Sequence, residues 1–199
     1  NNATAKKGCP TCAFKEPYGA FRSATEYIDG NTVKVEAGNY SLGFRGDGTS
    51  KEVPAGPYGL STDNYSTGID TFRLHLEQGA NIKFTQSRGI GTPHPAWVGW
   101  STQPKYIGIT GYGTFNSTNG TLFHHAVADG TFYMNIDKIE TGYSVGEFMN
   151  KESVFNIGTI NQTQGLTDYG GGLFFGPSLL SKTTRPKYSA KIKNWNVNK

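Results

Sequence analysis

The amino-acid sequence predicts an all-β protein, a parallel β-helix (solenoid) of about six coils with a short N-terminal capping helix. Three observations predict this fold. The chain has 27 glycines and 13% aromatic residues but only 17% charged residues, which is typical of a β protein with many turns. Short segments such as "YIGIT" (residues 106–110) place apolar side chains at every second position, as strands with one buried face do. This pattern also recurs at intervals typical of solenoid repeats.

The first expected elements are a short helix at residues 23–28 and a strand at residues 32–40. Asp29-Gly30 is a stop signal for the helix, and "TVKVEAGNY" then alternates as a strand. The end of a solenoid exposes unpaired strand edges, so an amphipathic helix over the first coil protects them. The side chains expected on its covering face are Phe21, Ala24 and Ile28.

The stretch "YIGITGYGTF" (residues 106–115) alternates, breaks at two glycines and resumes with an apolar residue. Glycine adopts backbone angles that are costly for other residues, so the break predicts a tight corner between two short strands. Related patterns occur in "NIKFT", "FYMNIDKIE", "VFNIGTINQ" and "SAKIKNWNV". We take Ile82, Ile109, Ile136, Ile157 and Ile192 as equivalent positions, separated by 27, 27, 21 and 35 residues.

An antiparallel sandwich or jelly roll is the alternative fold, because it also contains many short strands. Its strands are joined by hairpins, for which Asn-Gly and Asp-Gly are strong signals. Asn119-Gly120 and Asp129-Gly130 are such pairs, so the alternative stays open at this point. The repeating corner favours the solenoid, in which each equivalent Ile faces an interior stack.

Two segments resemble a known family. "SATEYIDGNTVKVEAGNYSL" resembles the first segment of pectin-lyase-like right-handed β-helix proteins, and "YIGITGYGTFNSTNG" is similar to a coil of polygalacturonase-like enzymes and phage tailspikes. The resemblance implies a right-handed β-helix over residues 21–199, preceded by a leader or linker at residues 1–20. The family contains polysaccharide hydrolases and lyases as well as non-catalytic virion and adhesin parts, so it implies a fold more than an activity.

The catalytic pattern of the polygalacturonase-like enzymes is absent from this sequence. There is no Asp-Asp pair and no Gly-His-Gly, and Asn116 stands where the enzymes have an Asp. Glycosidic hydrolysis needs two carboxyl groups about 5 to 9.5 Å apart, and the repeat alignment leaves Asp137 alone, beside Thr110 and Gly158. His124 and His125 are candidates for a base or a ligand, but adjacent strand residues face opposite ways. No catalytic residue is assigned.

Charge, hydropathy and cysteine content limit the classes of partner and cofactor that we expect. The net charge of +4 comes from interspersed residues rather than a basic stripe, so nucleic acid is not an expected partner. No run of 18 apolar residues exists, which argues against a membrane span. Cys9 and Cys12 are compatible with two thiols, a short-loop disulfide, or half of a zinc site completed by His124 and His125. No cofactor or metal is assigned.

Two further features of the sequence concern whether the protein is secreted. The chain does not begin with Met and its first residues lack the apolar core of a signal peptide, so we expect a processed form or a piece of a longer product. Asn-x-Ser/Thr sequences are compatible with secretion and equally with a surface rich in Asn and Thr. They begin at Asn2, Asn39, Asn64, Asn116, Asn119 and Asn161.

Candidate carbohydrate-binding residues lie on the outward positions of the expected strands. If Ile107, Ile109, Met134, Ile136, Phe155 and Ile157 point inward, Tyr106 and Tyr133 point outward and lie over one another in adjacent coils. Aromatic rings stack on sugar C–H faces, and neighbouring amides such as Asn135 and Asn156 supply donors and acceptors. A second candidate is the proline-rich loop at residues 92–104, which carries Trp97 and Trp100. The alternatives are an ordinary solenoid face or subunit contact for the tyrosines, and satellite core packing for the tryptophans.

The expected function is a non-catalytic structural domain of an extracellular or virion assembly, such as a phage tail or head fibre, that contacts surface polysaccharide or sister subunits. A homo-oligomer, most plausibly a trimer, is expected because the C-terminal edge near "KIKNWNVNK" is exposed. The alternatives are a polysaccharide lyase or glycosidase of the same fold, and a secreted adhesin.

Overall fold

The computed structural model describes residues 32–43, 60–61, 71–85, 97–101, 105–117, 122–127, 129–142, 144–163, 172–175 and 186–197. Within these ranges every regular element is a β-strand, which confirms the all-β class. The expected capping helix at residues 23–28, the leader at residues 1–20 and both cysteines lie outside the described residues.

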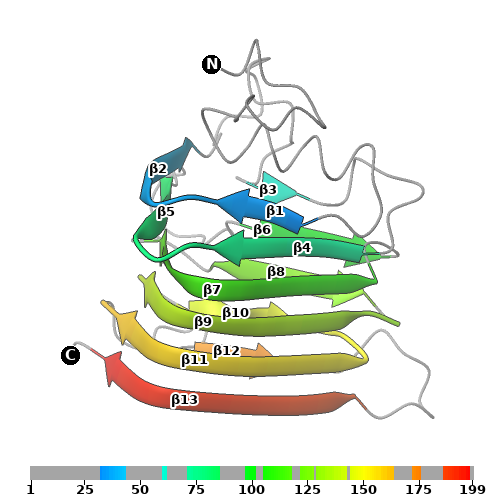
Figure 1. Cartoon of the computed structure of the whole chain (residues 1–199). Helices are drawn as coiled ribbons and strands as arrows, with labels where there is room; N and C mark the ends of the chain where they lie inside the picture. The colour runs from blue at the N-terminus through cyan, green and yellow to red at the C-terminus, as the bar shows by residue number, and fades with distance from the viewer. Residues whose placement is uncertain are drawn as a thin grey trace.

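One sheet has eight strands, and all of its pairings are parallel (Figure 1). Six strands follow one another in chain order: β1 (Thr32–Val35), β4 (Thr71–Leu76), β7 (Tyr106–Ser117), β9 (Thr131–Thr141), β11 (Glu152–Gln162) and β13 (Lys187–Val197). Two further strands, β2 (Gly38–Gly43) and β5 (Ala80–Thr85), pair with each other, and β5 pairs with β7. The strand expected at residues 32–40 is therefore two strands, β1 and the start of β2.

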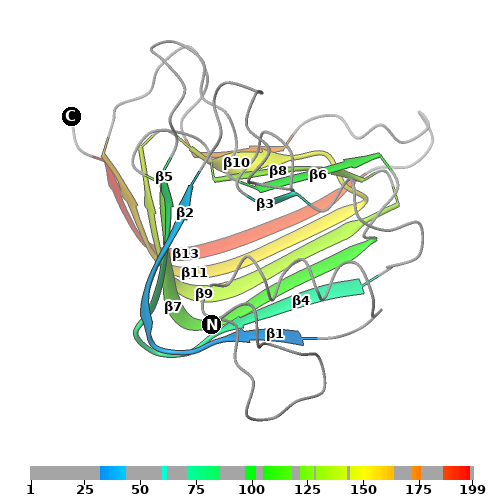
Figure 2. The ribbon, with the colours of Figure 1, turned by 90° about the horizontal axis from the view of Figure 1, so that it is seen from above.

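A second sheet has five parallel strands in the order β12, β10, β8, β6, β3. Their bounds are β3 (Leu60–Ser61), β6 (Trp97–Ser101), β8 (Phe123–Val127), β10 (Ser144–Phe148) and β12 (Gly172–Phe175). Along the sequence the chain passes repeatedly from the large sheet to the small one and back. In Figure 2 the long strands turn a corner at one side, and β6, β8 and β10 lie across the interior from them. Parallel strands in this order are consistent with a β-helix and not with the antiparallel sandwich.

Phenylalanine rings from both sheets fill the space between them. Phe132 on β9 and Phe148 on β10 lie 4.7 Å apart between ring centroids, and Phe148 lies 4.7 Å from Phe155 on β11. Phe115 on β7 meets Phe123 on β8 edge-on at 5.5 Å. Each such pair contributes about 0.5–1.5 kcal/mol beyond its buried area. The six side chains expected to point inward are all buried, which confirms the period-two interpretation.

The register of the strands is only partly as expected. Ile136, Ile157 and Ile192 are register partners, as the repeat alignment predicts. Ile109, however, pairs with Leu74 and Met134, and Ile82 pairs with Phe115. The alignment of β7 with β9 is wrong by two residues, because a two-residue slip leaves every side chain on the same face and alternation cannot detect it.

The glycine corner in β7 is confirmed, but it lies within one continuous strand, Tyr106–Ser117, and not between two short strands. The register of β7 against β9 shifts between Gly111 and Thr114, where the strand turns. Gly111 has a φ of 120°, in the region that favours glycine. A Cβ atom added there would lie 2.0 Å from the carbonyl oxygen of Leu76 on β4. A close approach of two backbones therefore requires glycine at this corner.

Tyr188 on β13 gives the fold a predicted sensitivity to alkaline pH. Its ring stacks on Phe175 at 4.5 Å, and burial raises the pKa of the phenol above 10.0. The raised pKa contributes stability below pH 10.0, and this contribution is lost as the pH rises through the folded-state value. We expect Tyr188→Phe to lose less stability than the wild type between about pH 8 and about pH 11 in urea titrations. Tyr112→Phe, at a ring that is 71% exposed, is the control that should behave as the wild type; equal pH dependence in all three proteins would contradict the prediction.

Candidate functional site

A row of polar side chains crosses the outer face of the large sheet. Its members are register partners on six successive strands, and we call them the polar row: Lys34, His75, Thr110, Asn135, Asn156 and Lys191. Lys34, His75, Asn135 and Asn156 each lie between two buried residues, such as Leu74 and Leu76 on either side of His75. Strands in a sheet are about 4.8 Å apart, so the polar row repeats at that spacing.

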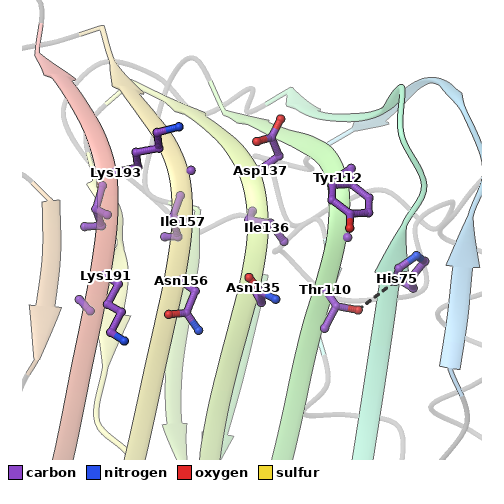
Figure 3. A pocket seen from close by; sticks show the side chains of 14 residues that line it. His75, Thr110, Tyr112, Asn135, Ile136, Asp137, Asn156, Ile157, Lys191 and Lys193 are labelled. Carbon is purple, nitrogen blue, oxygen red and sulfur yellow. Dashed lines mark hydrogen bonds between the residues drawn. The ribbon is translucent and has the colours of Figure 1, made fainter.

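A groove of about 810 Å³ lies along the polar row from His75 to Lys191. Figure 3 shows Tyr112, Asp137 and Lys193 in a second line beside it. Gly158 lies in this second line between Asp137 and Lys193, and a Cβ atom there would come within 2.9 Å of the Asp137 carboxylate. The absence of a side chain at Gly158 therefore leaves the space into which Asp137 leans.

Two asparagines line the groove, Asn135 and Asn156, and they differ in hydrogen bonding from the other asparagines on the outer face. Beyond the corner, Asn81 donates to Asn39 at 3.0 Å, Asn116 donates to Glu140 at 2.8 Å and Asn196 donates to Asn161 at 2.8 Å. Among the described residues, no hydrogen-bond partner is found for the side chains of Asn135 and Asn156. The amides of the groove are thus available to a ligand, whereas those beyond the corner bond to neighbouring side chains.

A second cavity, of about 580 Å³, adjoins the groove and shares His75 and Thr110 with it. Tyr106, Tyr133 and Arg73 line it. The Arg73 guanidinium lies 5.6 Å from the centroid of the Tyr106 ring, a cation–π contact. Gly108 lies beneath this ring, because a Cβ atom there would come within 2.8 Å of Tyr106 Cε1.

Four of the six predicted carbohydrate-binding residues lie on this outer face: Tyr106, Tyr133, Asn135 and Asn156. The expectation that Tyr106 lies over Tyr133 is wrong, since Tyr106 pairs with Thr131 and Tyr133 pairs with Gly108, again a two-residue slip. Both rings nevertheless line one cavity, because Tyr106 leans over Gly108.

Trp97 and Trp100 lie elsewhere, on β6 of the small sheet, so the segment expected as a loop is in part a strand. Their side chains are not among those described.

His124 and His125 lie on β8, beside β6 and β10, and their side chains are likewise outside the description. Asp137 is beside Gly158 as expected, but Thr110 pairs with Asn135.

The end of the groove at β4 contains an electrostatic cluster that the sequence analysis did not identify. His75 Nδ1 lies 2.9 Å from Thr110 Oγ1, and His75 Nε2 lies 3.9 Å from Glu77 Oε1. Lys34 Nζ lies 2.6 Å from the same Glu77 oxygen. A hydrogen bond to Lys34 lowers the pKa of Glu77, and the bond to Glu77 raises the pKa of Lys34. The alternation in "RLHLEQ" was a usable signal, since it places His75 and Glu77 on one outward face.

Comparison with protein-family models, with curated proteins and with solved structures gives no match. Within the described ranges, no three His, Cys, Asp or Glu residues are grouped so that they could hold a metal ion. The same part of the chain has no helix of the length and apolarity needed to cross a membrane. The structure defines the class of the protein as all-β, with two sheets of parallel strands and a polar groove on the outer face of the larger sheet.

Proposed function

We propose that this chain is a right-handed parallel β-helix of about six coils that forms a structural, glycan-contacting part of an extracellular or virion-surface assembly. The alternation of the chain between two parallel sheets supports the β-helix. The pectin-lyase-like resemblance, the tail-fibre role and the N-terminal capping helix belong to the same proposal and rest on the sequence patterns.

The observation that carries glycan binding is the groove in which the Asn135 and Asn156 amides have no partner among the described residues. Sugar hydroxyls both donate and accept hydrogen bonds, and an amide side chain offers both functions. The rings of Tyr106 and Tyr133 in the adjoining cavity supply apolar surface for the C–H faces of a sugar. The groove follows the stacking direction of the strands, which suits an extended chain of repeating units.

Binding is favoured over glycosidic cleavage by the composition of the groove. Hydrolysis by the common mechanism uses two carboxyl groups about 5 to 9.5 Å apart. Among the described residues that line the groove, Asp137 is the one carboxylate. The glycosidase alternative therefore ranks below binding.

The homo-oligomer expected from the sequence stays a prediction. β13 is the described strand at one end of the order in the large sheet, and Trp195 and Val197 on it are 40% and 45% exposed. A trimer would place several grooves in one particle, which would strengthen weak single-site binding through multivalency.

We expect the protein to bind one or more polysaccharides with a dissociation constant of about 1 mM per site. In a glycan array followed by titration calorimetry, the double variant Asn135→Ala/Asn156→Ala should weaken binding about tenfold or more, because two hydrogen-bonding amides are lost. Asn194→Ala is the matched control, since Asn194 lies beyond the corner and donates to Thr159 rather than facing the groove.

Unchanged affinity in the double variant would place the binding site elsewhere. No binding to any glycan by the intact protein would leave a purely structural role as the better account.

A further inference from the structure

We propose that the end of the groove at β4 and β7 is an acyl-transfer centre, with Thr110 as nucleophile and His75 as general base, that removes O-acyl esters from a bound saccharide. The geometry that points to it is the 2.9 Å hydrogen bond between Thr110 Oγ1 and His75 Nδ1. A hydroxyl becomes a nucleophile when a base within hydrogen-bond reach takes its proton. His75 is 31% exposed and Thr110 is half-buried, so a ligand in the groove can reach the pair.

Glu77 selects the productive tautomer of His75. Its carboxylate lies 3.9 Å from Nε2, which is too long for a hydrogen bond but close enough to favour a proton on that nitrogen. With the proton on Nε2, Nδ1 is the acceptor, and the Thr110 hydroxyl donates to it. This is the direction of proton transfer that a nucleophile and base require. Lys34 lies 2.6 Å from the same oxygen and keeps Glu77 ionised. Its positive charge also offsets part of the negative charge that Glu77 presents to His75. Glu77 is therefore a positioning residue.

Asn135 stands on the other side of Thr110 from His75. It is the register partner of Thr110 on β9, and Figure 3 shows the three side chains in line, with the dashed bond between Thr110 and His75. Its amide has no partner among the described residues, so its N–H groups are available to the oxygen on which negative charge develops during acyl transfer. The nucleophile thus lies between a base and a hydrogen-bond donor.

The reaction balances with water as the second reactant. Thr110 Oγ1 attacks the ester carbonyl carbon and its proton passes to His75 Nδ1, which gives a tetrahedral intermediate whose oxyanion is stabilised by Asn135. The bond from carbon to the sugar oxygen then breaks, and the sugar hydroxyl leaves with the proton from His75. Water, deprotonated by His75, attacks the carbonyl carbon of the acyl-Thr110 ester, and the bond from that carbon to Thr110 Oγ1 breaks. A carboxylic acid is released, and Thr110 Oγ1 takes the proton back from His75, which restores both residues. The inference that the substrate is a saccharide rests on the proposed glycan binding. The inference that the site cleaves esters does not depend on it.

The test measures hydrolysis of 4-nitrophenyl acetate and of O-acetylated oligosaccharides by the full chain. Thr110→Val removes the nucleophilic hydroxyl, keeps the shape of the side chain and leaves His75 in place. We expect kcat to fall about 100-fold or more. Thr110→Ser should retain activity. Thr131→Val, on the outward face of β9, is the matched control and should hydrolyse esters as the wild type does. Mass spectrometry of quenched reactions should find the acetyl group on Thr110, and Glu77→Gln should lower kcat with KM unchanged.

Several results overturn the proposal. They are an absence of ester hydrolysis by the wild type, a Thr110→Val protein as active as the Thr131→Val control, or an acetyl group found only on other residues. Circular dichroism and urea midpoints of each variant separate loss of chemistry from loss of fold. The two proposals fail separately: glycan binding without ester hydrolysis overturns the acyl-transfer centre alone, and hydrolysis of 4-nitrophenyl acetate without glycan binding overturns the saccharide proposal alone.

Discussion

An Ile136→Asp protein is expected to be largely unfolded. Ile136 on β9 is only 3% exposed and lies in register between Gly111 on one side and Ile157 on the other. An aspartate there would bury a charge among apolar side chains, or would have to take up a proton, at a cost of several kcal/mol. The whole stability of a domain is about 5–15 kcal/mol, so this one change removes much or all of it.

The neighbouring position supplies the control. Asn135 precedes Ile136 on the same strand but faces outward and is exposed, so Asn135→Asp adds the same carboxylate to the solvent side. Its urea midpoint should lie close to the wild-type value, while Ile136→Asp should show no cooperative transition at room temperature. If both variants fold with similar midpoints, the register of β9 in the large sheet is not as described.

Gly111→Ala is expected to have the second largest effect. An alanine would have to adopt a φ of 120°, which costs about 1–3 kcal/mol for a residue with a side chain. Its Cβ would also lie 2.0 Å from the Leu76 carbonyl oxygen and 2.8 Å from the Leu76 nitrogen. Both atoms belong to the backbone of β4, which cannot move without breaking its pairing with β7. We therefore expect a loss well above that caused by backbone strain alone.

Gly79→Ala separates strain from steric overlap. Gly79 also has a positive φ, of 84°, but a Cβ atom there would meet only the Ala37 Cβ at an ordinary 3.4 Å. This control should lose about 1–2 kcal/mol in urea unfolding. An equal loss in the two variants would show that the close approach of β7 to β4 at the corner does not matter to stability.

The sequence was informative about which side chains enter the core and about the glycine corner. Period-two alternation is a local property of a strand, so it identifies Ile109, Met134 and Phe155 as buried from their own neighbours. The corner at Gly111 is equally local, because the angles that it needs exclude other residues. The parallel, all-β arrangement followed from the recurrence of these local patterns.

The register across the strands and the site built on it were decided by the tertiary structure. A slip of two residues preserves the face of every side chain, so alternation could not place Tyr133 beside Gly108 rather than Tyr106. Thr110 and His75 are 35 residues apart in the chain, and the unequal numbers of residues between paired strand positions hide their pairing from any fixed repeat. The chain by itself determined which residues face inward and where it turns. Strand pairing, a non-local interaction, determined which outward residues meet in the groove.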